Sequence, residues 1–360
     1  MSGSIQNITI DDFDSVITYS DYGQWTTPNP QDHPTWYNAS QDVTGVPWHE
    51  ATIHWTTIPS ASFGLNFTAT SIWIYGSLNT TNTNYTVTLD GQSQPGSGTA
   101  GDGRVVLYES TSLTAGGHEI SVTNQGGGLG LDLVILGYDL GSGLTNNTLD
   151  DAGPSIAYQG TWTSEGGSFF NGSSIYTQGP NNSLSFNFSG SALYVYGDQV
   201  NDHGYFSLYF NDSTTPYATY NGRSGCGTGA YEKGCEKLGT LKAFVGGLPA
   251  GQHSVRIMNE SPQGSNATFF DFDYIEFTTP TTYPQFTINA TCPNGVCGSG
   301  SGSGSTPSPS GNGGNTATSA TTGPTGSAST ASGAERMLGW DGTLAWGVLG
   351  LWAMRRMGWF

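Results

Sequence analysis

The chain has 360 residues, enough for two domains, and it is rich in glycine and poor in charged residues. Its 27 acidic and 9 basic residues give a formal net charge of −18, which argues against binding to nucleic acid or to anionic lipid headgroups, since both attract basic surfaces. The abundance of aromatic and hydroxyl-bearing residues favours β-strands over helices.

The first predicted domain covers residues 5–142. Its stretch 62–77 is predicted to be a β-hairpin, because every second residue is apolar and a period of two is typical of half-buried strands. The other landmarks of this domain are, in chain order, Asp11-Asp12, Tyr19, Trp25, His118 and Asp132.

The second predicted domain, residues 143–279, repeats the first. Its hairpin, 183–198, aligns with the first hairpin at a shift of 121 positions (Ser62 to Ser183). The landmarks that match those of the first domain in order are Asp150-Asp151, Tyr158, Trp162, His253 and Asp271. The duplication predicts an all-β protein of two tandem antiparallel jelly-roll β-sandwiches. We interpret the recurring tryptophans as residues of the core or its edge and the recurring histidines as hydrogen-bonded turn residues.

Four cysteines suggest two local disulfides. Cys226 and Cys235 lie in an insertion specific to the second repeat, which a disulfide would restrict. Cys292 and Cys297 flank a Pro-Asn-Gly turn, so residues 280–297 are predicted to be a disulfide-stapled connector. Of the three possible pairings, we expect Cys226–Cys235 with Cys292–Cys297.

The composition changes after the connector. Residues 298–336 are mostly Gly, Ser and Thr and predict a disordered linker. Residues 337–360 form an apolar tail, interrupted by Asp341 and shorter than the ~20 apolar residues of a membrane span. We interpret the tail as a possible membrane tether, with a transmembrane span, a lipid-anchor signal and a non-membrane tail all left open.

Thirteen N-glycosylation sequons indicate passage through the secretory pathway. They begin at Asn7, Asn38, Asn66, Asn79, Asn84, Asn146, Asn171, Asn181, Asn187, Asn211, Asn259, Asn266 and Asn289. No signal peptide is visible at the N-terminus, and we expect that terminus to be truncated. The expected location is extracellular or at the cell surface, with the chain anchored to the membrane.

Four aspartates at the repeat starts and in the closing strands are candidate calcium ligands: Asp11, Asp132, Asp150 and Asp271. The first and last strands of a sandwich often pair, which would bring each set together, and carboxylate oxygens suit structural Ca²⁺. The alternatives are hydrogen bonds to turns and, less in keeping with the duplication, a glycosidase carboxylate pair. No other cofactor is expected.

Six residues in repeat-specific loops are the candidate ligand-binding residues. They are Trp36, Tyr37 and Trp48 in the first repeat and Tyr217, Tyr220 and Arg223 in the second. Aromatic rings with polar neighbours suit sugars, whose C–H faces stack while their hydroxyls form hydrogen bonds. The alternative is that these rings only pin long loops to the sandwiches.

One motif resembles a zinc site. His49, Glu50 and His54 have the spacing HExxxH, one residue longer than the HExxH of zinc proteases, and in a strand the two histidines would point to opposite faces. We therefore expect no metal here.

The repeat pattern, with its opening Asp-Asp, Tyr and Trp, its Tyr-Gly strand end and its Asp-bearing closing strand, resembles the galactose-binding-like jelly-roll sandwich of many carbohydrate-binding modules. In particular it is similar to tandem-repeat, stalked surface proteins of mushroom-forming fungi. The resemblance covers residues 5–279. It implies a non-catalytic cell-surface or cell-wall glycoprotein module that binds glycans or wall polysaccharide through loop aromatics. The alternatives are a carbohydrate-active hydrolase or lyase, and a structural spacer without a ligand.

Overall fold

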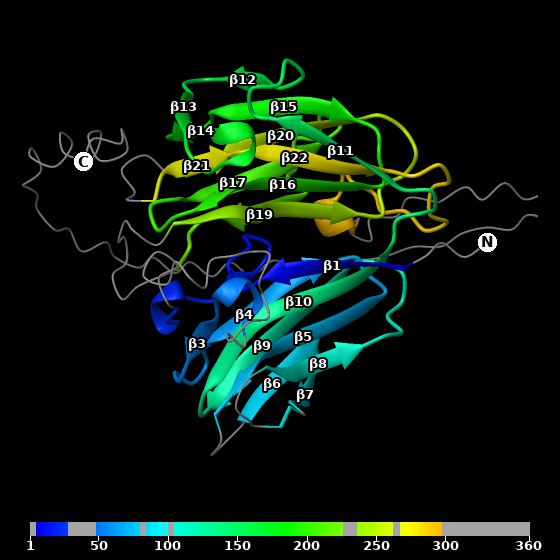
Figure 1. The fold of residues 1–360 in the computed structure, drawn as a ribbon. Helices are drawn as coiled ribbons and strands as arrows, with labels where there is room; N and C mark the ends of the chain where they lie inside the picture. The colour runs from blue at the N-terminus through cyan, green and yellow to red at the C-terminus, as the bar shows by residue number, and fades with distance from the viewer. Residues whose placement is uncertain are drawn as a thin grey trace, which may run out of the picture. The chain divides into compact units, whose positions relative to one another are not determined.

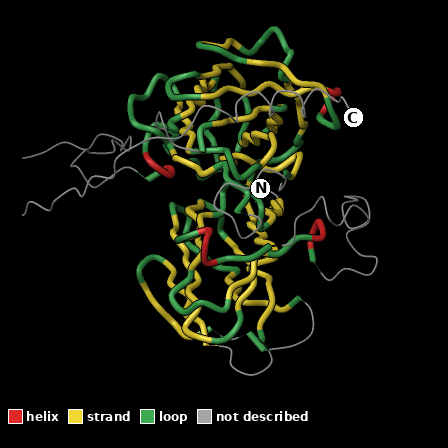
Figure 2. The backbone as a smooth tube through the Cα atoms, turned by 90° about the vertical axis from the view of Figure 1, so that its left-hand side faces the viewer, coloured by secondary structure: helices red, strands yellow, loops and turns green. Residues whose placement is uncertain are grey.

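The structure is a computed structural model. It describes residues 5–27, 48–79, 84–96, 98–99, 104–225, 236–261 and 267–296. The described residues form strands and short 3-10 turns, and all pairs of named strands run antiparallel. Figure 2 shows the same composition, with helical segments only as brief turns between strands. The all-β antiparallel fold predicted from the period-two pattern is confirmed.

The first repeat folds into two sheets (Figure 1). One has the strand order β1-β10-β5-β8 with β3 beside β10, and the other has the order β2-β4-β9-β6-β7. The bounds are β1 Ile5–Asp11, β2 Thr18–Tyr19, β3 His54–Thr56, β4 Ser62–Phe67, β5 Ser71–Leu78, β6 Asn84–Leu89, β7 Gln92–Pro95, β8 Val105–Ser110, β9 His118–Gly126 and β10 Leu129–Asp139. Two 3-10 turns, η1 (Tyr22–Gln24) and η4 (His49–Ala51), precede β3.

The second repeat also folds into sheets with an antiparallel order. They are β11-β22-β16-β19, β12-β15-β20-β17-β18 and a smaller sheet β13-β14-β21. The bounds are β11 Thr145–Asp150, β12 Ala157–Gln159, β13 Thr163–Gly166, η5 Phe170–Gly172, β14 Ser173–Gln178, β15 Ser183–Phe188, β16 Ala192–Gln199, β17 Tyr205–Phe210, β18 Ala218–Asn221, β19 Lys237–Gly246, β20 His253–Asn259, β21 Phe269–Phe272, β22 Tyr274–Thr279 and η6 Pro293–Gly295.

The predicted hairpins are wrong in their pairing, although their strands are right. β4 and β5 belong to different sheets, and so do β15 and β16. Each pair turns a corner from one sheet to the other, so the alternating apolar residues of both strands face one interior. A period of two identifies the buried face of a strand but not its neighbour.

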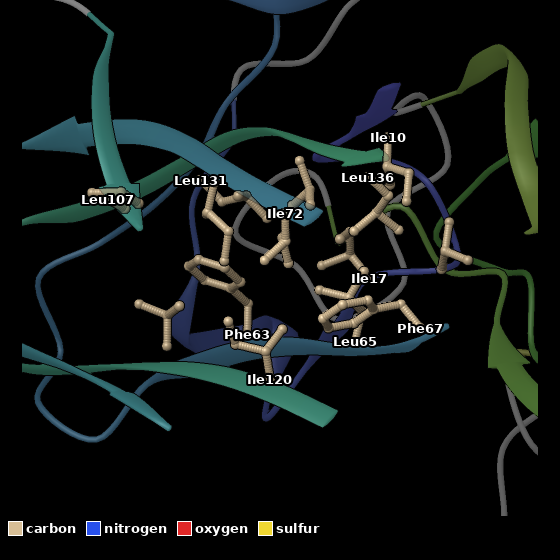
Figure 3. Close-up of a cluster of buried hydrophobic side chains, with 14 of the residues drawn as sticks. Ile10, Ile17, Phe63, Leu65, Phe67, Ile72, Leu107, Ile120, Leu131 and Leu136 are labelled. Carbon is tan, nitrogen blue, oxygen red and sulfur yellow. The ribbon is translucent and has the colours of Figure 1, made fainter. Parts of the chain in front are cut away.

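The core of the first repeat lies between its two sheets. Figure 3 shows Phe63 and Leu65 of β4 on one side and Ile72 of β5 and Leu131 of β10 on the other. All four side chains are buried. Trp25 is buried in the same core, as its recurrence predicted. In the second repeat its counterpart, Trp162, packs partly buried against the core.

The recurring histidines hold turns, as predicted. The Nε2 atom of His118 lies 2.8 Å from the carbonyl oxygen of Thr114, and that of His253 lies 3.0 Å from the carbonyl oxygen of Pro249. His118 also pairs through Nδ1 with Asp90 at 2.7 Å. Both rings therefore tie a strand to the turn that precedes it.

Residues 1–302 belong to one compact unit, in which β19 of the second repeat contacts the first. Backbone N–H of Ser15 donates to the carbonyl of Leu241 at 3.1 Å, and the rings of Tyr138 and Phe244 meet edge to face at 5.0 Å. The two sandwiches thus share both hydrogen bonds and apolar contacts.

Little of the predicted cysteine pattern falls within the described residues. Cys292 is disulfide-bonded, and the other three cysteines lie outside the described part of the chain, so the two pairings stay predictions. The linker and the apolar tail lie outside it as well. Within the described ranges, no helix has the length and hydropathy needed to cross a membrane.

Candidate functional site

Two equivalent turns place a backbone N–H beside a buried carboxylate. The first N–H of η4 donates to Asp132 Oδ1 at 2.6 Å, and the first N–H of η5 donates to both oxygens of Asp273 at 3.1 Å. The middle residue of each turn is left-handed, with φ of 46° at Glu50 and 51° at Asn171. The duplication therefore extends to the detailed geometry of these loops.

This equivalence corrects the alignment of the closing strands. The backbone N–H of Asp12 donates to the carbonyl of Asp132, and that of Asp151 donates to the carbonyl of Asp273. Asp273, and not Asp271, is therefore the counterpart of Asp132. The sequence Phe-Asp-Phe-Asp has an aspartate at both positions, and a slip of two residues leaves the buried face of a strand unchanged.

A lysine from the second repeat neutralises carboxylates of the first. Lys237 Nζ contacts the carboxylate of Asp11 and lies 2.6 Å from that of Glu50. The lysine side chain is 1% exposed, whereas that of Glu50 is 39% exposed. Lys237 lowers the pKa of Glu50, while burial raises the pKa of Asp11. Asp14, beside them, accepts hydrogen bonds from the N–H groups of Asp11 and Leu241, both at 2.8 Å.

A second buried pair, Asp12 and His54, lies next to this cluster. His54 Nδ1 is 2.6 Å from Asp12 Oδ2, and Nε2 is 3.2 Å from the carbonyl of Ser224. Burial raises the pKa of Asp12 and lowers that of His54 to about 3. A protonated Asp12 can therefore donate to Nδ1 while the neutral ring donates from Nε2, which satisfies both contacts without a buried charge.

The two histidines of the HExxxH motif lie in different elements of the described structure. His49 lies in the η4 turn rather than in a strand, and only His54 lies in β3. The ring of His54 is held by Asp12 and by a carbonyl of the second repeat. The expectation that no metal binds here rested on strand geometry for both histidines, which was wrong for His49.

The first and last strands of each repeat pair, as predicted, and Asp11 lies opposite Leu133, the neighbour of Asp132. The aspartates proposed as calcium ligands nevertheless have different partners. Asp11 contacts Lys237, and Asp132 contacts Arg104. Asp150 ends β11 opposite Tyr274. Asp271 accepts from the hydroxyl of Ser174 at 2.8 Å and from the N–H of Asp198 at 3.0 Å. Calcium binding stays a prediction, now with a different environment for each carboxylate.

Asp271 belongs to an acidic group that lies close to a buried lysine. Its carboxylate oxygens lie within 4.8 Å of those of Glu165 and Asp198. Lys242 donates to the carbonyl of Asp198, and its Nζ lies 5.5 Å from the ring centre of Phe270. Burial lowers the pKa of Lys242, and the charges of Asp198 and Asp271 offset only part of this effect. This ammonium group supplies the positive charge that such a group of carboxylates requires.

An aromatic and acidic crevice of about 320 Å³ lies between β1, β16 and β19. Its walls include Tyr194 and Tyr196, both half-buried, together with His49, Glu50 and Asp11. The ring of Tyr196 stacks on that of Tyr274 at 4.5 Å with an interplanar angle of 14°. The crevice thus combines aromatic residues with hydrogen-bonding groups.

The structure separates the predicted ligand-binding residues. Tyr217 and Tyr220 line a second cavity, of about 290 Å³, and Arg223 lies 5.9 Å from the ring centre of Tyr22. Trp48 precedes η4, lies half-buried and lines neither cavity. Trp36 and Tyr37 lie outside the described residues.

Sequence reasoning missed Lys237, Lys242, Tyr194 and Tyr196. The two lysines stand in the strand Lys237–Gly246, whose other residues are largely apolar, and a lysine in such a strand is a sign of a buried ion pair. The tyrosines alternate with Leu193 and Val195 and so face away from the core of their own sandwich. Neither pattern reveals which other segment of the chain these lysines and tyrosines contact.

Asp273 provides a test of pH dependence. Burial raises its pKa from 3.8 to about 7, so between these pH values the folded protein holds a proton that the unfolded chain has lost. Stability from this group is therefore lost as pH rises through that window. We expect Asp273→Asn to raise the free energy of unfolding by on the order of 2 kcal/mol at pH 8 and to change it little at pH 4.

Urea unfolding of the wild-type protein and of Asp273→Asn between pH 4 and pH 8 measures this effect. Glu276→Gln is the control, since Glu276 lies on β22, the strand that begins directly after Asp273, and is half-buried. A pH dependence identical in Asp273→Asn and wild type would contradict the expectation.

Comparison with known proteins gives limited similarity. No protein-family model matches the chain. The chain is 25% identical over 178 residues to an "A type blood alpha-D-galactosamine galactosaminidase" from Flavonifractor plautii. The match covers 48% of this chain, which spans only 15% of that protein.

The similarity to solved structures is weaker. A family two carbohydrate esterase from Cellvibrio japonicus has a TM-score of 0.27 and 16% identity, covering 40% of this chain and 37% of that one. A Paenibacillus xanthan lyase has a TM-score of 0.27 and 13% identity, covering 77% and 27%. The ANXUR2 extracellular domain from Arabidopsis thaliana has a TM-score of 0.23 and 9% identity, covering 78% and 100%. TM-scores this low do not establish a shared fold.

Proposed function

We propose that this protein is a non-catalytic carbohydrate-binding module and that the crevice between β1, β16 and β19 is its ligand site. The observation that carries the proposal is that one crevice is lined both by the aromatic residues Tyr194 and Tyr196 and by the polar residues His49 and Glu50. A sugar ring would stack a C–H face on the tyrosines and direct its hydroxyls to the carboxylate and imidazole.

The sequence similarity to a galactosaminidase supports a carbohydrate-related role. Glycans or polysaccharides are accordingly the proposed partners. We further propose that the chain belongs to the galactose-binding-like jelly-roll family and lies at the cell surface, held by a membrane tether. We also propose that it binds a structural calcium ion.

The absence of catalysis is part of the proposal. The Asp11 carboxylate is held by Lys237, and both oxygens of Asp14 accept backbone N–H groups. Groups fixed in this way can orient a ligand, whereas a general acid or base has to exchange its proton with the substrate. The alternative is a hydrolase or lyase that acts through Glu50, because Glu50 is more exposed than Asp11 and Asp14.

A glycan array probed with the full chain tests the proposal. We expect a discrete sugar signal that Tyr196→Ala weakens about tenfold, because loss of one stacking surface costs roughly 1.4 kcal/mol. Tyr176→Ala is the matched control, since this half-buried tyrosine of β14 lies outside the crevice. Asn7→Gln is measured in parallel, because Asn7 stands in a sequon and lines the crevice.

The outcomes separate the candidate functions. Equal loss of binding in Tyr196→Ala and Tyr176→Ala would remove the crevice as the site. A folded wild-type protein that binds none of the array sugars would favour the structural spacer. Release of free sugar that disappears in Glu50→Gln would favour the enzyme.

A further inference from the structure

The described sequons differ sharply in exposure. Ten of their asparagines are exposed: Asn7, Asn66, Asn79, Asn84, Asn146, Asn171, Asn181, Asn187, Asn211 and Asn289. Asn259 is the exception, being 1% exposed, with its side-chain amide donating to the carbonyl of Thr268 at 2.8 Å and its carbonyl accepting from the N–H of Ser261 at 3.1 Å. A glycan on Asn259 would have no room around this buried side chain, so this sequon serves as an internal negative reference.

Asn66 differs from the other exposed asparagines because it lines the cavity that holds Tyr217 and Tyr220. It lies on β4 between the buried Leu65 and Phe67, so its side chain points out of the sandwich core. Within the described residues the side-chain amide of Asn66 has no hydrogen-bond partner, so its nitrogen Nδ2 is open to substitution.

The cavity has the chemistry of a sugar-binding surface. Pro216 and the rings of Tyr217 and Tyr220 supply apolar faces, and Thr215 and Asn294 supply polar groups. The volume of about 290 Å³ lies at the lower end of the range of small-ligand pockets.

We infer that Asn66 carries an N-linked glycan and that the first sugars of this glycan occupy the cavity against Pro216, Tyr217 and Tyr220. In the modification, Asn66 Nδ2 forms a bond to the anomeric carbon of a lipid-diphosphate-linked oligosaccharide. The bond from that carbon to the phosphate oxygen breaks, the lipid diphosphate leaves, and Nδ2 gives up one proton. This site is separate from the crevice of the proposed function.

Two further observations are consistent with this modification. Thr68, the hydroxyl residue of the sequon, is buried in the folded protein, where its hydroxyl lies 3.4 Å from the carbonyl oxygen of Gly246. The sequon is therefore available only before the repeats close on one another. Cys292 is disulfide-bonded, as expected of a chain that matures in an oxidising compartment.

Glycopeptide mass spectrometry on the full chain, produced in a eukaryotic secretory host, is the first test. We expect Asn66 to be occupied and Asn259 to be unoccupied. An unmodified Asn66 would overturn the inference.

Hydrogen exchange then tests where the glycan lies. In Asn66→Gln we expect the segment 215–220 to exchange roughly three- to tenfold faster than in wild type, because the cavity loses its occupant. Asn146→Gln is the matched control, since Asn146 is exposed on β11 and lines neither the crevice nor this cavity. Enzymatic removal of glycans from the folded wild-type protein should reproduce the faster exchange without any substitution. Unchanged exchange after both treatments would show that the glycan extends into solvent and would overturn the assignment of the cavity.

Discussion

Replacing Lys237 with methionine is expected to lower the free energy of unfolding by about 3–5 kcal/mol, the cost of removing one partner from a buried ion pair. Methionine is unbranched and only one atom shorter than lysine, but it leaves the carboxylates of Asp11 and Glu50 without their cation. Because Asp11 is buried, its charge would have to be lost by protonation or exposed by local opening. Urea unfolding at pH 7 measures the change.

A second substitution distinguishes the ion pair from simple packing. Asp11→Asn combined with Lys237→Met removes both charges, and we expect this double variant to recover at least 1 kcal/mol relative to Lys237→Met, a coupling within the range for contacting residues. Arg256→Met is the control for loss of a cation, since Arg256 stacks on Tyr209 at 4.0 Å from the ring centre at the surface. If Lys237→Met and Arg256→Met have equal effects, the buried ion pair does not stabilise the fold.

The second large effect is expected for Lys242→Met, again about 3–5 kcal/mol. Here the lysine lies inside the second repeat, where it donates to the backbone carbonyl of Asp198 beside the rings of Phe206 and Phe270. The charges of Asp198 and Asp271 act on it from nearby. Its loss would leave buried carboxylates that repel one another. The change is measured by thermal and urea unfolding, with far-UV circular dichroism to confirm the strand content before heating.

A matched comparison makes this result specific. Lys242→Arg keeps the positive charge but has a longer, planar head, and we expect it to recover part of the lost stability. If Lys242→Met were as stable as the wild type, the carboxylates of this group would have to be neutral in the folded protein, and the lysine would not be their counter-charge.

Sequence reasoning predicted the repeated strands because the alternation of apolar residues within each strand indicates which of its faces is buried. The alternation of apolar residues marked β4, β5, β15 and β16, and the recurrence of Trp25 marked a core position. It failed where the answer depended on a neighbour. The corner between β4 and β5 was taken for a hairpin, and the two aspartates of Phe-Asp-Phe-Asp were interchangeable to any pattern of period two.

The site was beyond sequence reasoning for a related reason. Asp11 and Lys237 are 226 positions apart, and nothing in either local sequence names the other as its partner. The crevice tyrosines looked like ordinary surface residues of a strand until the first repeat closed over them. By contrast, Tyr217 and Tyr220 were singled out by their insertion, and the structure does place both of them in one cavity.

The ion pair across the duplication also bears on the order in which the molecule is made. A ribosome completes the first repeat long before it reaches position 237, and domains generally fold as units from the N-terminus during synthesis. During synthesis the first sandwich therefore lacks the cation that pairs with Asp11 and Glu50. We expect it to be less stable at that stage than in the complete chain. It becomes fully stable when the later copy supplies Lys237. Two copies that began as equals have become a first half that depends on its second.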